Sequence, residues 1–183
     1  VSWQMLSPTP THAKSETPGA DVRWASAASS STPQFSRHVQ PLLGKAGCSN
    51  RACHGSFQGK GGFRLSLFAS DGKLDYQNLA NSGRIDLDAP DESLILQKPM
   101  RLLDHEGGLR FSKGSWQHHV LRAWIAGGAP NRSESDPALL RIDITPTSLT
   151  FAQKGDTEKL HCLAHFSDGT AEEVTALTRF SSN

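Results

Sequence analysis

The stretch Gly47-Cys48-Ser49-Asn50-Arg51-Ala52-Cys53-His54-Gly55 places two cysteines close together and a histidine directly after the second one. A close cysteine pair can form a small disulfide loop, supply half of a zinc site or, when a histidine follows directly, hold covalently attached haem. In haem attachment each thiol adds to a vinyl group and the histidine binds the iron. The usual spacing leaves two residues between the cysteines. Because four residues separate Cys48 from Cys53, the motif is a widened version of the haem pattern.

The zinc and disulfide alternatives each leave something unexplained. A structural zinc site needs four ligands, usually from a second close pair, and the remaining cysteine, Cys162, lies far along the chain. A disulfide between Cys48 and Cys53 gives no role to His54 or to the surrounding glycines. Three cysteines also do not make a disulfide framework, which uses more cysteines in a shorter chain. From these residues alone, the disulfide is the stronger of the two alternatives to haem.

The composition is that of an ordinary globular chain. Its 183 residues include 19 Lys and Arg against 18 Asp and Glu, and 36% of them are apolar. Because the basic residues are scattered through a nearly neutral chain, we expect neither nucleic acid nor an anionic membrane surface as a partner. No apolar stretch approaches the roughly 20 residues that a membrane-spanning helix needs. We therefore expect no membrane span in this chain.

Local composition divides the chain into four segments. Residues 1–33 are rich in Ser, Thr, Pro and Ala without hydrophobic periodicity, which predicts a flexible leader. Residues 34–130 are denser in apolar residues and glycine and contain the cysteine pair, so they form the main domain. Residues 131–138 have the polar, proline-containing composition of a linker. Residues 139–183 follow a β pattern and form a second domain.

Helical periodicity brackets the main domain. Apolar residues at i, i+4, i+7 and i+8 predict a short helix over residues 35–43, before the cysteines. A second apolar stripe predicts a helix over residues 116–125, with Ser115 as its N-cap. Between them, alternation over residues 63–67 indicates a short strand or extended segment, and Pro90 is suited to open a short helix that continues through Leu96. The prediction is a mostly helical domain with long connections.

Several motifs in residues 35–130 together resemble the planctomycete-type cytochrome c domain. These motifs are Val39-Gln40-Pro41-Leu42-Leu43, the stretch from Gly47 to Gly55, the run from Gly59 to Phe68, Asp75-Tyr76, the run from Leu94 to Pro99, the run from His105 to Phe111 and the run from Trp124 to Pro130. The widened Cys-x4-Cys-His spacing is typical of that family. The resemblance implies a mainly α, cytochrome c-like domain with long loops. It also implies one covalent haem c, held by Cys48 and Cys53, with His54 as the proximal iron ligand.

The distal iron ligand has two main candidates, His105 and Met100. Both lie well after His54, in the loop between helices where a second ligand can reach the haem. Small cytochromes tend to have Met-Pro, whereas this chain has the reverse order, and the resembled family has a recurrent histidine in His-x-Gly-Gly. We therefore favour His105, which predicts a six-coordinate, low-spin haem of comparatively low potential. His118 and His119 are weaker candidates, because a polar-face or capping role on the second helix explains them.

Three basic residues are candidate partners of the haem propionates: Lys60, Arg64 and Arg110. Solvent-exposed charge is an equally good explanation for all three. The glycine run at residues 59–62 is not a phosphate loop, because it lacks the Gly-Lys-Ser/Thr ending and no strand-loop-helix unit surrounds it. We interpret it as backbone that packs closely near the haem.

The last segment, 139–183, resembles the opening half of a bacterial immunoglobulin-like domain of the second group. The matching residues are Ile144-Thr145-Pro146, Gly155, the stretch from Phe166 to Thr170, Val174-Thr175 and the stretch from Phe180 to Asn183. About half the strands of such a sandwich are missing, so the segment should expose apolar strand faces. We expect it to be poorly ordered, docked on the haem domain or paired with another copy in a dimer. Cys162 is expected to be a small buried residue of this segment.

These patterns predict an electron-transfer domain within or beside a larger redox protein. Electron transfer needs no catalytic residue, so we expect no enzyme in this chain, and the partner is a redox protein or a downstream domain of the same polypeptide. Because covalent haem attachment takes place outside the cytoplasm, we expect the periplasm or an equivalent compartment, with a signal peptide removed. Two alternatives remain open: a haem sensor or weak peroxidase with an open sixth position, and a haem-free, disulfide-stabilised interaction module.

Overall fold

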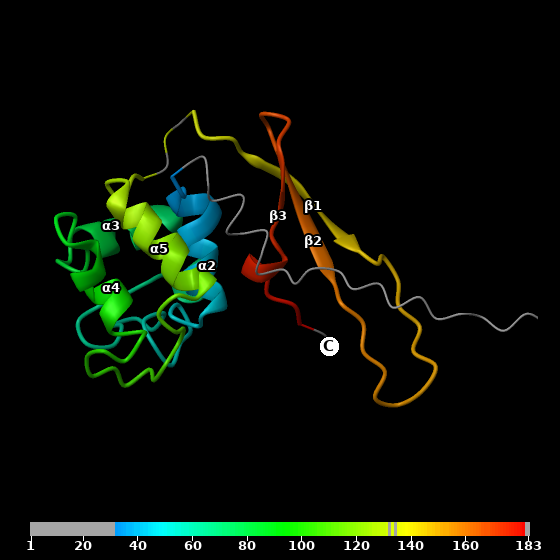
Figure 1. Cartoon of the computed structure of the whole chain (residues 1–183), viewed down its shortest axis with the longest axis horizontal. Coiled ribbons are helices and arrows are strands. Elements are labelled where there is room, and N and C mark those ends of the chain that lie inside the picture. Colours follow the sequence, from blue (N-terminus) through cyan, green and yellow to red (C-terminus); the bar gives the residue numbers. More distant parts are fainter. Residues whose placement is uncertain (1–31, 132, 134, 182–183) are drawn as a thin grey trace, which may run out of the picture.

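The computed structural model describes residues 32–131, 133 and 135–181. Figure 1 shows the helices gathered on one side of the molecule and three strands on the other. The prediction of a helical part followed by a partial β segment is confirmed at this level. The predicted leader, apart from its last two residues, lies outside the described residues, as do two positions of the predicted linker. No helix in the described part is long and apolar enough to cross a membrane.

The helical part contains five longer elements and two short 3-10 turns. The longer elements are a π-helical turn η1 (Phe35–Val39) followed by α2 (Gln40–Lys45), α3 (Gly72–Ala80), α4 (Leu94–Gln97) and α5 (Trp116–Ala126). The 3-10 turns are η2 (Leu67–Ala69) and η3 (Pro90–Glu92). Most of the remaining chain between residues 46 and 115 is loop, in agreement with the predicted long connections.

The first and last helices of this part hold its core together. The predicted stripe of η1 and α2 is buried, as is that of α5. Phe35 and Trp124 join the two, with ring centroids 5.6 Å apart, and Tyr76 packs edge-on against Phe35 at 5.2 Å. The predicted N-cap is confirmed, because the hydroxyl of Ser115 accepts a hydrogen bond from the backbone N–H of His118.

The predicted single helix through residues 90–96 is wrong. The 3-10 turn η3 ends at Glu92, the next residue Ser93 has an extended ψ of 130°, and α4 begins only after it. Ser93 is buried and its hydroxyl accepts a hydrogen bond from the backbone N–H of Asp86. This contact to an earlier loop competes with continuation of the helix, as serine side chains commonly do.

Helix α3 was not predicted, because its sequence carries little helical periodicity. Only Leu79 and Asp75 are buried in it, and Asp71 caps it by accepting from the N–H of Leu74. The buried carboxylate of Asp75 accepts hydrogen bonds from the backbone N–H and the hydroxyl of Ser66. Burial raises the pKa of this carboxyl. These bonds tie α3 to the segment around residues 63–67, which belongs to no described strand: Phe63 forms an isolated bridge with Lys60, and Leu67 begins η2.

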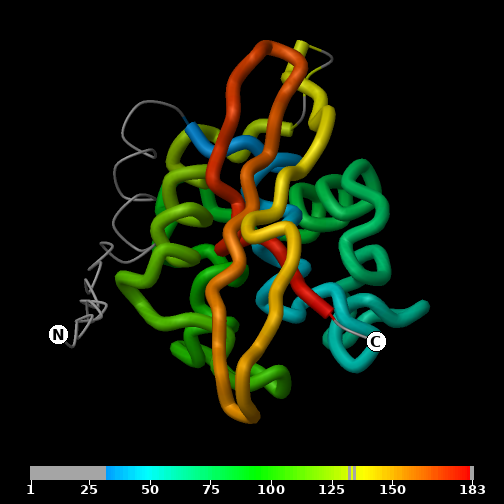
Figure 2. The backbone as a smooth tube through the Cα atoms, turned by 90° about the vertical axis from the view of Figure 1, so that its right-hand side faces the viewer, coloured from blue at the N-terminus to red at the C-terminus, as the bar shows by residue number. Residues whose placement is uncertain are grey.

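The C-terminal part is a three-stranded antiparallel sheet in the order β1-β2-β3. Its strands are β1 (Leu139–Thr145), β2 (His161–Phe166) and β3 (Ala171–Glu173), and a 3-10 turn η4 (Thr175–Leu177) follows. The predicted burial of Cys162 is confirmed, and Ala164 and Phe166, at alternate positions of β2, are buried with it. Figure 2 shows the strands running across one face of the helical part.

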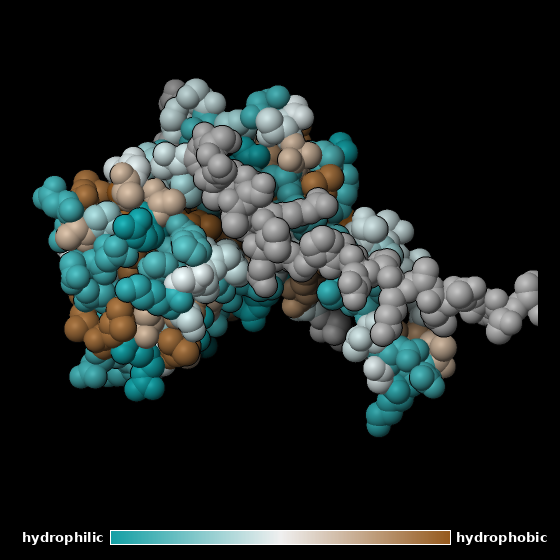
Figure 3. All heavy atoms as spheres, viewed as in Figure 1, coloured by the Kyte–Doolittle hydropathy of each residue, from teal (hydrophilic) through white to brown (hydrophobic). Residues whose placement is uncertain are grey.

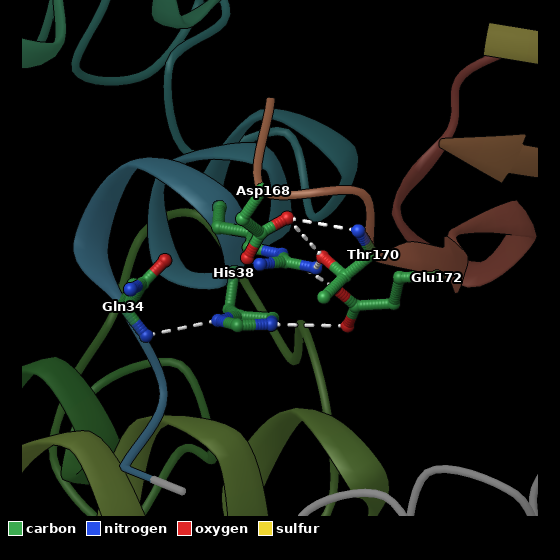
Figure 4. Close-up of polar contacts among 6 residues, drawn as sticks. Gln34, His38, Asp168, Thr170 and Glu172 are labelled. Carbon is green, nitrogen blue, oxygen red and sulfur yellow. Dashed lines mark hydrogen bonds and ion pairs between the residues drawn. The ribbon is translucent and has the colours of Figure 1, made fainter. Parts of the chain in front are cut away.

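The sheet docks on the first helix through a polar cluster (Figure 4). The guanidinium Nε of Arg37 donates to Glu172 at 2.7 Å, and Nε2 of His38 lies 3.0 Å from the other carboxylate oxygen. The guanidinium of Arg37 also lies over the ring of Phe166, 3.5 Å from its centroid. For residues 139–183 we expected poor order, docking on the preceding domain or pairing with another copy. The structure of this single chain shows docking on the helical part. Strand β1 is exposed along its whole length, including apolar Ile142 and Ile144, as expected for an incomplete sandwich.

Candidate functional site

A cavity of about 310 Å³ lies beside the cysteine pair, and it brings together most of the predicted site residues. Its apolar walls are Leu43, Phe63, Leu94, Ile95 and Pro99. Cys48, Cys53, His54 and His105 also line it. The charged residues of the lining are Lys60, Arg84, Lys98, Asp104 and Glu106. An apolar slot with thiols and imidazoles on its walls has the composition of a cofactor site.

The cysteine loop folds back on itself directly after α2. The N–H of Cys48 donates to the carbonyl of Leu43 at 2.9 Å, and the N–H of His54 donates to the carbonyl of Cys48 at 3.0 Å. A Cβ on Gly55 would lie 1.9 Å from the carbonyl oxygen of Ser49, so only glycine fits there. The four residues between the cysteines therefore form a compact turn that brings Cys53 and His54 to the same cavity wall as Cys48.

The two thiols are free and differ in their surroundings. Cys48 is buried, and desolvation raises the pKa of its thiol to about 11. Cys53 is half-buried, and a guanidinium nitrogen of Arg110 lies 3.6 Å from its sulfur.

His54 is held in one orientation by backbone carbonyls. Its Nδ1 lies 3.0 Å from the carbonyl oxygen of Phe63 and 3.2 Å from that of Lys60. Carbonyls only accept, so Nδ1 carries the proton and Nε2 keeps its lone pair. Burial lowers the pKa of the imidazole, which favours the neutral, metal-binding form. Gly59 allows the turn that presents these carbonyls, because its φ is +66° and a Cβ would lie 2.0 Å from the oxygen of Phe63.

His105 is oriented in the same way from the facing loop. Its Nδ1 lies 2.9 Å from the carbonyl oxygen of Gly108, which again leaves Nε2 with its lone pair. A Cβ on Gly107 would lie 2.7 Å from Cε1 and 3.0 Å from Nε2 of this ring, so glycine makes room for the imidazole. The His54 and His105 rings are nearly parallel, with an interplanar angle of 17° and centroids 6.4 Å apart.

The centroid distance between the two imidazoles is compatible with one metal ion bound by both rings. Imidazole nitrogens bind metals at about 2.0–2.1 Å, and each nitrogen lies about 1.1 Å from its ring centroid, so two rings on opposite sides of one ion have centroids roughly 6 Å apart. The observed 6.4 Å agrees. The described residues contain no group of three or more His, Cys, Asp or Glu side chains that could hold a bare metal ion. Iron in haem needs only two protein ligands, because the porphyrin supplies the other four.

Only some of the other predicted site residues line this cavity. Lys60 lines it and pairs with Glu106 at 3.6 Å. Arg110 lies at the cysteines rather than in the lining, and Arg64 lies outside the cavity, over the ring of Phe57. Met100 is buried in the hydrophobic core and is not part of the lining. The structure thus brings His105 and Lys60 to the cavity, but not Met100 or Arg64.

His118 is buried on α5 and does not line the cavity. Its Nδ1 accepts from the N–H of Gly114 at 3.4 Å, and its Nε2 lies 3.8 Å from Asp91. Burial, with the nearby His119, lowers the pKa of His118. The buried position shows that a polar-face role is wrong for His118, whereas its hydrogen bond with Gly114, just before α5, fits a capping role.

Sequence reasoning missed two basic residues of the cavity, Arg84 and Lys98. It also missed the role of Phe63, whose ring packs 4.8 Å from that of His54. Arg84 also lies over the Phe63 ring, with its guanidinium carbon 4.4 Å from the ring centroid. Nothing in the local sequence around Arg84 marks it, because it reaches the cavity only through the folding of the loop after α3.

We compared the chain with models of known protein families, with curated proteins and with solved structures. No family model, curated protein or solved structure matches it. The functional argument therefore rests on the residues and contacts described above.

Proposed function

We propose that this chain is an electron-transfer domain that binds one haem c covalently. Cys48 and Cys53 would form the thioether bonds, and His54 and His105 would bind the iron from opposite sides. The observation that carries the proposal is the pair of nearly parallel imidazoles 6.4 Å apart in a cavity that both thiols also line. The resemblance of the motifs to the planctomycete-type cytochrome c domain supports the same proposal.

The protein's contribution is to fix the two imidazoles before the cofactor binds. In both histidines a backbone carbonyl holds the Nδ1 proton, which sets the tautomer and aims the Nε2 lone pair. Such outer hydrogen bonds orient metal ligands and raise their basicity. Apolar residues, among them Leu43 and Ile95, line the cavity and would pack against a bound cofactor. Ligands held in fixed orientations keep reorganisation small when the charge on the iron changes.

The haem, when bound, would supply reversible one-electron chemistry at its iron. Two histidines give a lower potential than a histidine and a methionine do. The position of Met100 in the core supports His105 as the distal ligand. A filled sixth position disfavours the sensor and peroxidase alternatives, because both need an open site at the iron. No residue is proposed as catalytic.

The redox partner would dock near the loop that carries His105. Three exposed leucines lie close to this histidine in the chain: Leu102 at 60% exposure, Leu103 at 43% and Leu109 at 59%. Apolar residues also stand out among polar ones on the face of the helical part in Figure 3. A partner protein, or a downstream domain of the same polypeptide, would cover such leucines.

The compartment that fits covalent haem attachment is the periplasm or its equivalent.

The test of this proposal compares the two candidate distal ligands in haem-loaded protein. In H105A the sixth position should open, so the reduced protein should bind carbon monoxide while the unchanged protein does not. In M100L the absorption spectrum should stay that of a low-spin, six-coordinate haem, because Met100 packs in the core. A thioether-to-iron charge-transfer band in the oxidised protein that disappears in M100L would overturn the assignment of His105.

A further inference from the structure

The cations of the cavity lining are not equivalent. Lys60 is paired with Glu106 at 3.6 Å, and Lys98 donates to the backbone carbonyl of Asp104 at 3.3 Å. Both lysines are thus engaged with the loop that carries His105. Arg84 has no carboxylate partner among the described residues. It is the one cation of the described lining whose side chain contacts neither an acidic side chain nor that loop.

Arg84 is nevertheless held firmly in place. Its guanidinium donates to the carbonyls of Ser82 at 3.1 Å and Gly61 at 3.3 Å. Its face lies over Phe63, on whose ring His54 also packs. Partial burial lowers the pKa of Arg84, although a guanidinium stays charged at any ordinary pH. A fixed positive charge without a counterion at a cavity wall is a binding group for an anion.

We propose that Arg84 binds a carboxylate of the group that occupies this cavity, namely a haem propionate. The inference rests on the proposed haem function and deepens it, because it assigns a residue other than Lys60, Arg64 and Arg110 to the propionate. The planar guanidinium can donate two parallel hydrogen bonds to the two oxygens of a carboxylate, whereas the ammonium of a lysine acts as a point charge. The two carbonyls and the Phe63 ring hold the guanidinium in position.

The charged groups around Arg84 determine how its pairing with a propionate should affect the potential of the iron. The lining also presents Lys60, Lys98, Asp104 and Glu106, together with the imidazoles of His54 and His105. The two lysines and two acids largely offset one another, so Arg84 supplies the net positive charge of the lining. A carboxylate paired with it stays ionised to lower pH. The midpoint potential of the iron should therefore change with pH only in the acidic range, where that carboxylate gains its proton.

The test compares R84Q with R64Q in haem-loaded protein, by redox titration across acidic to alkaline pH. R84Q should lower the potential at neutral pH, since loss of a nearby positive charge favours the oxidised iron, and should move the pH-dependent change upward. R64Q should match the unchanged protein, because Arg64 lies outside the cavity over Phe57. The proposal would be overturned if haem-loaded R84Q showed the same pH dependence of the midpoint potential as the unchanged protein. This holds even if the potential of R84Q were lower by the same amount at every pH.

A second variant keeps the test decisive if R84Q does not load haem. R84K keeps the positive charge but loses the planar guanidinium donors and their stacking on Phe63. The pH at which the midpoint potential changes should therefore rise in R84K, but by less than in R84Q. An R84K profile that matches the unchanged protein contradicts the proposal. If neither variant loads, a folded circular dichroism spectrum in both supports an anchoring role, and unfolding in both contradicts it. Absence of haem from the unchanged protein would instead refute the proposed function itself.

Discussion

At the scale of single residues, the two cysteines should differ in reactivity before haem is attached. Cys48 is buried and its thiol pKa is raised from 9.0 to about 11, which means a roughly hundredfold smaller thiolate fraction than for an ordinary thiol near neutral pH. Cys53 is half-buried beside Arg110. We predict that a maleimide labels Cys53 of the haem-free protein well before Cys48, as measured by peptide mass spectrometry over time.

The control for this labelling is Cys162, which is also buried. It should label slowly in the native protein and quickly after denaturation, as should Cys48. Equal labelling rates for Cys48 and Cys53 in the native protein would show that the described burial of Cys48 is wrong.

Gly107 is the residue that makes room for His105. In G107A the added Cβ would meet Cε1 of His105 at 2.7 Å, so the ring must move away from its present position. We predict weaker distal ligation, by about tenfold as for other changes that disturb ligand orientation. The measurement is carbon monoxide binding to the reduced, loaded protein, which should increase.

G44A is the matched control for G107A. A Cβ on Gly44 would meet the Cβ of Ala69 at 3.5 Å, which is ordinary contact, so this variant should keep the spectrum of the unchanged protein. Unaltered carbon monoxide binding in G107A would argue that His105 does not reach the iron.

The residues of the candidate site differ in how far the sequence could predict them. Cys48, Cys53 and His54 are adjacent in sequence, so their meeting in space follows from one short turn. His105 was predicted from a motif and does line the cavity. Arg84 could not be predicted, because its place beside Phe63 depends on two loops that are distant in sequence.

At the scale of elements, the N-cap of α5 offers a direct test of the helical part. The hydroxyl of Ser115 accepts from the N–H of His118, and this contact satisfies a backbone donor that the helix leaves free. We predict that S115A lowers the free energy of unfolding by about 1 kcal/mol. S112A, which changes an exposed serine just before the helix, should have little effect in the same urea titration. Equal losses in the two variants would contradict the capping role.

Elements were predictable where one face is consistently apolar. The stripes of α2, α5 and β2 are of this kind, and all three elements exist. Helix α3 buries only Leu79 and Asp75, so its amphipathic signal is weak and it was missed. Residues 90–96 were predicted as one helix because the turn at Ser93 depends on a hydrogen bond with Asp86 in the preceding loop. Tertiary contacts of this kind override local propensity.

At the scale of the whole molecule, Glu172 links the sheet to the helical part (Figure 4). Burial alone would raise the pKa of Glu172, but its hydrogen bonds and charge interactions with His38 and Arg37 lower it below the ordinary 4.5. A lowered pKa in the folded state means that the ionised carboxylate stabilises docking above pH 4.5. This contribution is lost as the pH falls through the lowered value.

We predict that E172Q weakens docking by about 1 kcal/mol at neutral pH, which corresponds to about fivefold faster cleavage of the β segment in limited proteolysis. E158Q, in an exposed loop, should be cleaved at the unchanged rate. The difference between E172Q and the unchanged protein should vanish in strongly acidic buffer, tested with an acid-active protease. A difference that persists there would mean that the carboxylate charge is not what holds the sheet.

The central claim is covalent haem at the widened cysteine motif. It is tested most directly by producing the chain with a haem-maturation system, then recording the alkaline pyridine spectrum and the intact mass of the unchanged protein, C48A, C53A and the double variant. We predict a mass gain of one haem with the spectrum of two thioethers in the unchanged protein, one thioether in each single variant and no covalent haem in the double variant. An unchanged protein without added mass or visible absorbance would contradict the claim.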